Sequence, residues 1–168
     1  AAAEVLYREI ARIAELSGTE RVLGLYCGTG PIEIFLSGSA ATVRGIDSGD
    51  TNISDAVANC RINKVTNCSF RSGTVEKLHE NAPCDLIVVD PPREGLTPKA
   101  LAQVVAPAVP RIVYVSCNPA ALARDAKQLT EHGYRLQKVR PVDMFPHTQH
   151  VENVCALRLR DSEARAEG

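Results

Sequence analysis

A cysteine in the stretch SCNP has the setting of a catalytic nucleophile. Cys117 follows the apolar run Arg111–Ser116 and precedes Asn118-Pro119, a pair that is typical of a helix start. A thiol at the end of a buried strand and at a helix N-terminus feels the positive end of the helix dipole, which favours the thiolate. Cys117 is therefore a candidate for covalent catalysis. The alternative is a buried structural cysteine.

The stretch DMFPHTQHVE, residues 143–152, is dense in polar groups, yet it leads into an apolar strand. A carboxyl group buried at that point suits a general base, and Glu152 is the candidate. His147 and His150 raise the alternative of a metal site. Since no third and fourth ligand stands at a suitable spacing, the sequence predicts no metal.

Glycines follow an apolar run in the stretch LYCGTG, residues 25–30. Such a turn lets a ligand approach the backbone and lie on the N-terminus of the next helix. Asp47 ends the second predicted strand, where an acid can bind two ribose hydroxyls. Gly28 and Asp47 therefore predict a nucleoside site. The alternatives are a plain tight turn and a solvated strand-end charge.

The stretch DPPREGL, residues 90–96, follows another apolar run. Its two prolines fix the backbone and free the carboxylate of Asp90 from helix formation. A rigid loop that holds an acid suits recognition of a flat ring with N–H donors. Arg93 is placed to meet a phosphate or solvent. The alternative is a turn that only terminates the strand.

These motifs need elements that bring them together. Strands are predicted at 21–27, 42–47, 67–71, 85–90 and 111–117, with helices at 1–16, from 31, at 52–63, after 98 and at 119–132. This alternation predicts an α/β fold with a doubly wound, mostly parallel sheet. Strands at 134–144 and 151–160 lack a crossover helix and are expected to pair antiparallel. All four motifs then meet at the carboxyl ends of the strands.

Composition and charge fit an ordinary soluble domain. The chain has 168 residues, of which 45% are hydrophobic and 23% charged, and we expect one domain at 1–160, with a leading helix within 1–18 and a frayed tail at 161–168. Six cysteines without a C-x-x-C pair and the lack of a bilayer-spanning run predict a cytoplasmic protein with no membrane contact. A net charge of −1 excludes RNA binding by bulk electrostatics. The missing initial methionine indicates an excised piece of a longer chain.

The motifs LYCGTG, DPPREGL, VYVSCNPAALARD and DMFPHTQHVE, in this order, resemble the RNA uridine C5-methyltransferase family. The resemblance runs from about Ala3 to Arg160, and its last two motifs are the most specific. It implies a Rossmann-like methyltransferase fold, S-adenosylmethionine as donor, and a uridine of tRNA or rRNA as substrate. It covers only the C-terminal catalytic part, so a monomer attached to upstream RNA-binding segments is expected.

The resemblance also implies roles for matching residues. Cys117 resembles the nucleophile that adds to carbon 6 of the uracil, and Glu152 resembles the base that removes the carbon 5 proton after methyl transfer. The expected cofactor-binding residues are Tyr26, Gly28, Asp47, Thr74 and Asp90, and the expected substrate-binding residues are Asp90 and Arg93.

Three positions depart from the family pattern. Gly24 stands where the first strand usually carries an acid, Pro31 stands where a polar residue is common, and residues 47–50 (DSGD) put Gly and Ser where helix formers are common. Gly24, the near-neutral charge and the missing upstream segment predict that this chain in isolation binds cofactor and RNA weakly. Two alternatives stay open: a methyltransferase of this fold that acts on an amino nitrogen and needs no cysteine, and a non-catalytic binding module.

Overall fold

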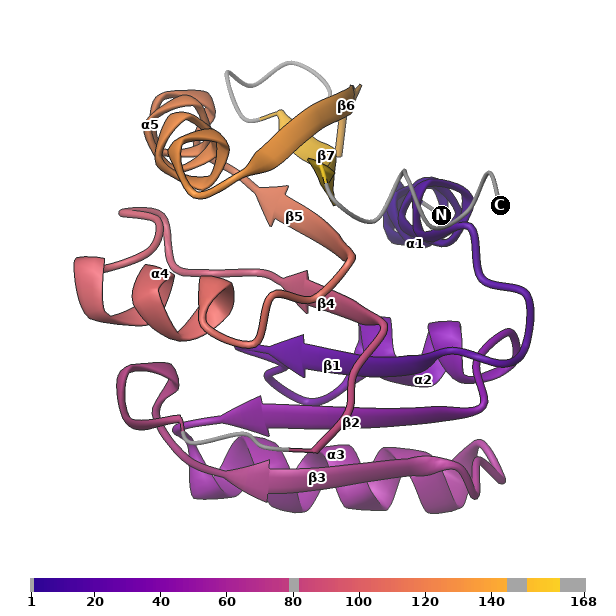
Figure 1. The fold of residues 1–168 in the computed structure, drawn as a ribbon. Helices are drawn as coiled ribbons and strands as arrows, with labels where there is room; N and C mark the ends of the chain where they lie inside the picture. Colours follow the sequence, from indigo (N-terminus) through magenta and orange to yellow (C-terminus); the bar gives the residue numbers. More distant parts are fainter. Residues whose placement is uncertain (1, 79–81, 145–150, 161–168) are drawn as a thin grey trace.

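The computed structural model describes residues 2–78, 82–144 and 151–160, within which seven strands form one sheet (Figure 1). The strands are β1 (Arg21–Leu25), β2 (Thr42–Asp47), β3 (Cys68–Ser72), β4 (Leu86–Val89), β5 (Arg111–Ser116), β6 (Tyr134–Val142) and β7 (Glu152–Leu159). Their order is β3-β2-β1-β4-β5-β7-β6. The first five are parallel, and β7 is antiparallel to both β5 and β6. The predicted fold class and terminal antiparallel pair are confirmed.

Helices cover both faces of this sheet. The helices α1 (Ala2–Ala14), α2 (Pro31–Ser37) and α3 (Asp50–Ile62) lie on one face, and α4 (Pro98–Val105) and α5 (Pro119–Glu131) lie on the other (Figure 1). Each face has its own apolar core. All four residues of β4 are buried, as expected for a strand that is covered on both sides. A short 3₁₀ helix, η1 (Val75–Lys77), was not predicted.

Local signals in the sequence set the helix ends. The Thr97 hydroxyl accepts a hydrogen bond from the Ala100 amide at 3.1 Å, so Thr97 is the predicted N-cap of α4. The Asn118 side chain caps α5 in the same way, ahead of Pro119. Gly133, with φ of +93°, follows α5 in the left-handed region that favours glycine.

The parallel strands all end at one edge of the sheet, here called the carboxyl edge, and begin at the opposite, amino edge (Figure 1). The four motifs follow strand ends at the carboxyl edge, as predicted. Residues 145–150 of the last motif and the predicted frayed tail at 161–168 lie outside the described residues. In the described part of the chain, no helix is long and apolar enough to cross a bilayer.

Candidate functional site

The pairing of β5 with β7 brings two motifs together. Ser116, the last residue of β5, pairs with Asn153 on β7, so Cys117 directly follows this pair on one strand and Glu152 directly precedes it on the other. Both side chains are partly exposed. The sequence proposed these two residues on separate grounds, and the sheet places them on adjacent strands at the carboxyl edge.

Asp90 follows β4, the other neighbour of β5. Its side chain keeps contact with solvent. The protein atoms packed around it, and then the negative charge of Glu152, raise the pKa of Asp90 to about 7. Asp90 therefore lies close enough to Glu152 for the two carboxyl groups to influence each other.

The proline loop after Asp90 is held by the start of α5. The Asn118 side-chain amide donates to the Arg93 carbonyl at 2.9 Å, and Arg124 donates to the Glu94 carbonyl at 2.6 Å. The residue after Cys117 thus fixes the loop that carries Asp90. The Arg93 side chain itself is exposed.

Asp125 is a buried acid that the sequence did not single out. It lies on α5 and is fully inaccessible to solvent. Its Oδ2 accepts hydrogen bonds from the Leu96 amide at 2.7 Å and from the Tyr114 hydroxyl at 2.6 Å, and Arg124 pairs with its Oδ1 at 2.8 Å. Asp125 therefore ties the proline loop to both β5 and α5.

Asp47 organises the glycine turn. Its Oδ2 accepts from the Gly28 amide at 2.9 Å, and its Oδ1 accepts from the Gly49 amide at 2.9 Å and the Asn52 side chain at 3.0 Å. Burial alone would raise the pKa of Asp47, but the hydrogen bonds from Asn52, Gly49 and Gly28 outweigh it and lower the pKa. Asp47 is therefore an ionised carboxylate at neutral pH.

Tyr26 adopts the left-handed backbone region with φ of +59°, which is rare for a residue with a side chain. Its half-buried ring packs against the core on the α4 and α5 face. Burial, followed by the charges of Glu76 and Asp125, raises its pKa to about 12, so the hydroxyl stays protonated. Thr74 is exposed and precedes η1, and the amide of its neighbour Gly73 donates to the Asp47 carbonyl at 2.9 Å.

Glu33 is a second acid that the sequence did not single out. It lies in the first turn of α2 with only 3% of its surface exposed. Burial, together with the charges of Asp90 and Asp47, raises its pKa to about 8. An acid in the first turn of a helix is ordinary in sequence, so nothing local marked Glu33 as buried.

The described residues hold no group of three or more His, Cys, Asp or Glu side chains that could bind a metal ion. His147 and His150, weighed above as ligands, lie outside those residues.

The strand order, the glycine turn and the acids at the carboxyl edge define a Rossmann-like class I methyltransferase domain. Residues 78–160 match the family described as tRNA (uracil-5-)-methyltransferase, which confirms the predicted resemblance. The chain is 45% identical over 162 residues to an uncharacterised RNA methyltransferase of Listeria innocua. This alignment covers 94% of the chain and 36% of that relative. A Geobacter sulfurreducens relative with the same description is 44% identical over 160 residues. That alignment covers 92% of the chain and 32% of the relative.

Solved structures agree with this family. A Pyrococcus abyssi tRNA (uracil-54, C5)-methyltransferase in complex with S-adenosyl-L-homocysteine has 36% identity and a TM-score of 0.82, covering 93% of the chain and 38% of that protein. The N-methyltransferase NodS of Bradyrhizobium japonicum shares the fold, with a TM-score of 0.79 and 16% identity. The superposition covers 94% of the chain and 87% of NodS. The chain spans about a third of the length of the curated relatives it matches.

Proposed function

We propose that this protein methylates carbon 5 of a uridine in rRNA or tRNA, with S-adenosylmethionine as donor and Cys117 as covalent nucleophile. The observation that supports the proposal is the pairing of Ser116 with Asn153, next to which Cys117 and Glu152 stand on the two strands, with Asp90 after the neighbouring strand β4. A nucleophile, a base and an orienting acid can thus act on different atoms of one flat ring.

The residues around the glycine turn fit the donor. Gly28 has open space where a side chain would begin, and the Asp47 carboxylate can accept further hydrogen bonds from ribose hydroxyls. One oxygen of Glu33 is buried without a hydrogen-bond partner. Three acids near one edge favour a cation, and S-adenosylmethionine, when bound, supplies an electrophilic methyl group on a sulfonium centre. Tyr26 and Thr74 flank the same site as further contact residues.

Cys117 acts first in the proposed reaction. Its thiolate adds to carbon 6 of the uracil, which makes carbon 5 nucleophilic enough to take the methyl group. Asp90 can meanwhile donate a hydrogen bond to a ring carbonyl or accept one from a ring N–H, since its pKa is about 7. Glu152 then removes the proton from carbon 5, the carbon–sulfur bond breaks, and its electron pair returns to Cys117.

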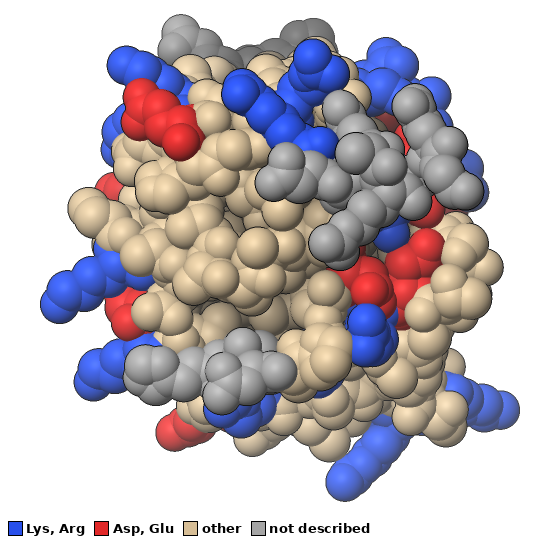
Figure 2. All heavy atoms as spheres, viewed as in Figure 1, with Lys and Arg blue, Asp and Glu red and all other residues tan. Residues whose placement is uncertain are grey.

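The β6–β7 hairpin is the surface proposed for the RNA backbone. β6 carries basic residues and no acidic one, and Figure 2 shows Lys and Arg side chains gathered where β6 lies. The basic residues of the hairpin are Arg135, Lys138, Arg140, Arg158 and Arg160. Because Val142 pairs with Glu152, β6 ends beside the proposed catalytic pair. A strand of RNA along β6 would present a uridine there.

Substitution of Glu152 by Gln in the full-length protein tests the proposal. Addition of Cys117 and methyl transfer need no base, but release does, so turnover should fall ~10²–10⁴-fold while a covalent protein–RNA band appears on a denaturing gel. Cys117→Ala should give neither product nor band. Normal turnover of a folded Glu152→Gln variant, or lost activity without a shifted band, would contradict the role of Glu152. Methyl transfer to an amino nitrogen, detected by mass spectrometry of the RNA, would contradict the proposed reaction.

A further inference from the structure

The side chain of Glu33 on α2 lies directly against Gly24 on β1. A Cβ atom at position 24 would overlap Oε1 of Glu33 and would come within 2.8 Å of its Cδ. The Glu33 carboxyl group therefore fills the volume that a side chain at position 24 would take. Any larger residue at 24 would require Glu33 to leave.

The Glu33 carboxyl group has an unusual environment for a structural acid. One of its oxygens, Oε2, is buried without a hydrogen-bond partner. The titratable groups that act on it or respond to it are Tyr7 on α1, Cys27 in the glycine turn, Asp47 at the end of β2, Cys68 on β3 and Asp90 after β4. All of these are acids, phenols or thiols. Burying an acid in such company costs free energy that a purely structural role would avoid with an apolar side chain.

The position of this carboxyl group relates it to the ligand edge. Gly24 pairs with Gly45 on β2 and with Val88 on β4. Asp47 and Asp90 stand two residues further along the same strands, which in a strand is the same face. The Glu33 carboxyl group thus lies on the face that α2 covers, two residues further from the carboxyl edge than Asp47 and Asp90.

We propose that Glu33 is an acid of the cofactor site, supplied by α2 in the space left open at Gly24, and that it gives up its proton to solvent when a cationic cofactor occupies the glycine turn. This inference rests on the proposed function for the identity of that cofactor. Glu33 acts as a positioning residue: its negative charge lies behind the turn and stabilises the bound cation across a low-dielectric layer. The glycine at position 24 then does not mean that the site lacks this acid, because Glu33 on α2 supplies the carboxyl group that the family usually carries on the first strand.

Calorimetric titration of the full-length protein with S-adenosylmethionine at pH 7, in two buffers of different ionisation enthalpy, tests the inference. The wild type should release protons on binding. Glu33→Gln, which keeps the side-chain volume, should release nearly one proton fewer, since Glu33 has a pKa of about 8 when the site is empty. At pH 7 its affinity should fall about tenfold for each unit by which binding brings that pKa below 7. Glu20→Gln, a change at the amino edge, should alter neither quantity.

A double variant guards against a folding defect. Gly24→Asp alone should lower the melting temperature, because the new side chain overlaps Glu33. Gly24→Asp combined with Glu33→Ser returns the acid to β1 and should regain most of the lost affinity. Wild-type affinity and proton release in Glu33→Gln, or a folded double variant without affinity, would overturn the inference. Cys117→Ala should leave binding unchanged, so failure of the uridine chemistry would be seen separately, in the RNA product.

Discussion

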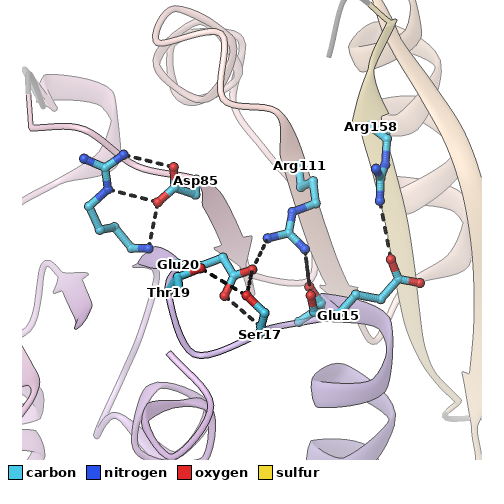
Figure 3. Close-up of polar contacts among 9 residues, drawn as sticks. Glu15, Ser17, Thr19, Glu20, Asp85, Arg111 and Arg158 are labelled. Carbon is cyan, nitrogen blue, oxygen red and sulfur yellow. Dashed lines mark hydrogen bonds and ion pairs between the residues drawn. The ribbon is translucent and has the colours of Figure 1, made fainter. Parts of the chain in front are cut away.

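The amino edge of the sheet and the carboxyl edge differ in how their acidic side chains are partnered. At the amino edge, Arg21 Nε donates to Asp85 at 2.9 Å, and Arg111 on β5 pairs with Glu20 at 3.4 Å (Figure 3). Hydrogen bonding to Arg21 lowers the pKa of Asp85. Burial alone would raise the pKa of Glu20, but its hydrogen bonds with Ser17 outweigh this and lower it.

At the carboxyl edge, hydrogen bonds hold Asp47 in the same way, but Asp90 and Glu33 are affected by their surroundings and by other acids. Burial and the charge of Glu152 raise the pKa of Asp90 to about 7, and burial raises that of Glu33 to about 8. One edge thus uses charge to stabilise the fold, and at the other we expect the ionisation of the acids to respond to a ligand. Raised pKa values in one place, together with a nucleophile, are the physical mark of a functional site.

The largest expected difference between the edges concerns two cysteines. Cys117→Ala should reduce methyl transfer to background, because the covalent route needs the thiolate. Cys84→Ala, at the amino end of β4, should keep most activity. Burial raises the pKa of Cys84 to about 11, so limiting iodoacetamide at neutral pH should label Cys117 first. Mass spectrometry of the brief reaction checks this, and preferential labelling of Cys84 would count against the assignment.

Much of this edge was predictable from the sequence alone. The strands, the Thr97 cap and the positions of Cys117, Asp90 and Glu152 follow from local patterns, namely apolar runs, caps and strand-end motifs. Glu33 and Asp125 were missed because their importance arises from packing. Only the seating of α2 on Gly24, and of α5 on the proline loop, buries these acids, and no local pattern specifies either contact.

The next effect concerns Asp125, a buried acid that accepts hydrogen bonds from the proline loop and from β5. Asp125→Ala should lower the free energy of unfolding by about 3 kcal/mol, since it leaves a buried hydroxyl and a buried amide without an acceptor. The proline loop should also loosen, so hydrogen exchange at the Leu96 amide should speed up. The exposed Asp55 on α3 provides a control, and Asp55→Ala should change stability little. Equal stability of the two variants in urea titrations would refute the structural role of Asp125.

A smaller effect follows from the ionisation of Glu33. Its pKa rises from an ordinary 4.5 to about 8 in the folded protein. Between these values the folded state binds more protons than the unfolded state, so stability falls as pH rises. Glu33→Gln should remove this contribution, and its melting temperature relative to wild type should therefore be higher at about pH 8.5 than at about pH 5. A pH-independent difference between the two proteins would mean that Glu33 does not titrate in this range.

The smallest expected effect lies at the amino edge and has the opposite sign. Asp85 has a pKa below its ordinary value of 3.8, so its contribution to stability is present above that value and is lost as pH falls through the lowered pKa. Asp85→Asn should lower the melting temperature slightly at neutral pH, because the pair with Arg21 is partly exposed and screened by water. The difference from wild type should vanish in acid and shrink in high salt. If Asp85→Asn instead became relatively more stable as pH rose, as expected for Glu33→Gln, the contrast between the two edges would be wrong.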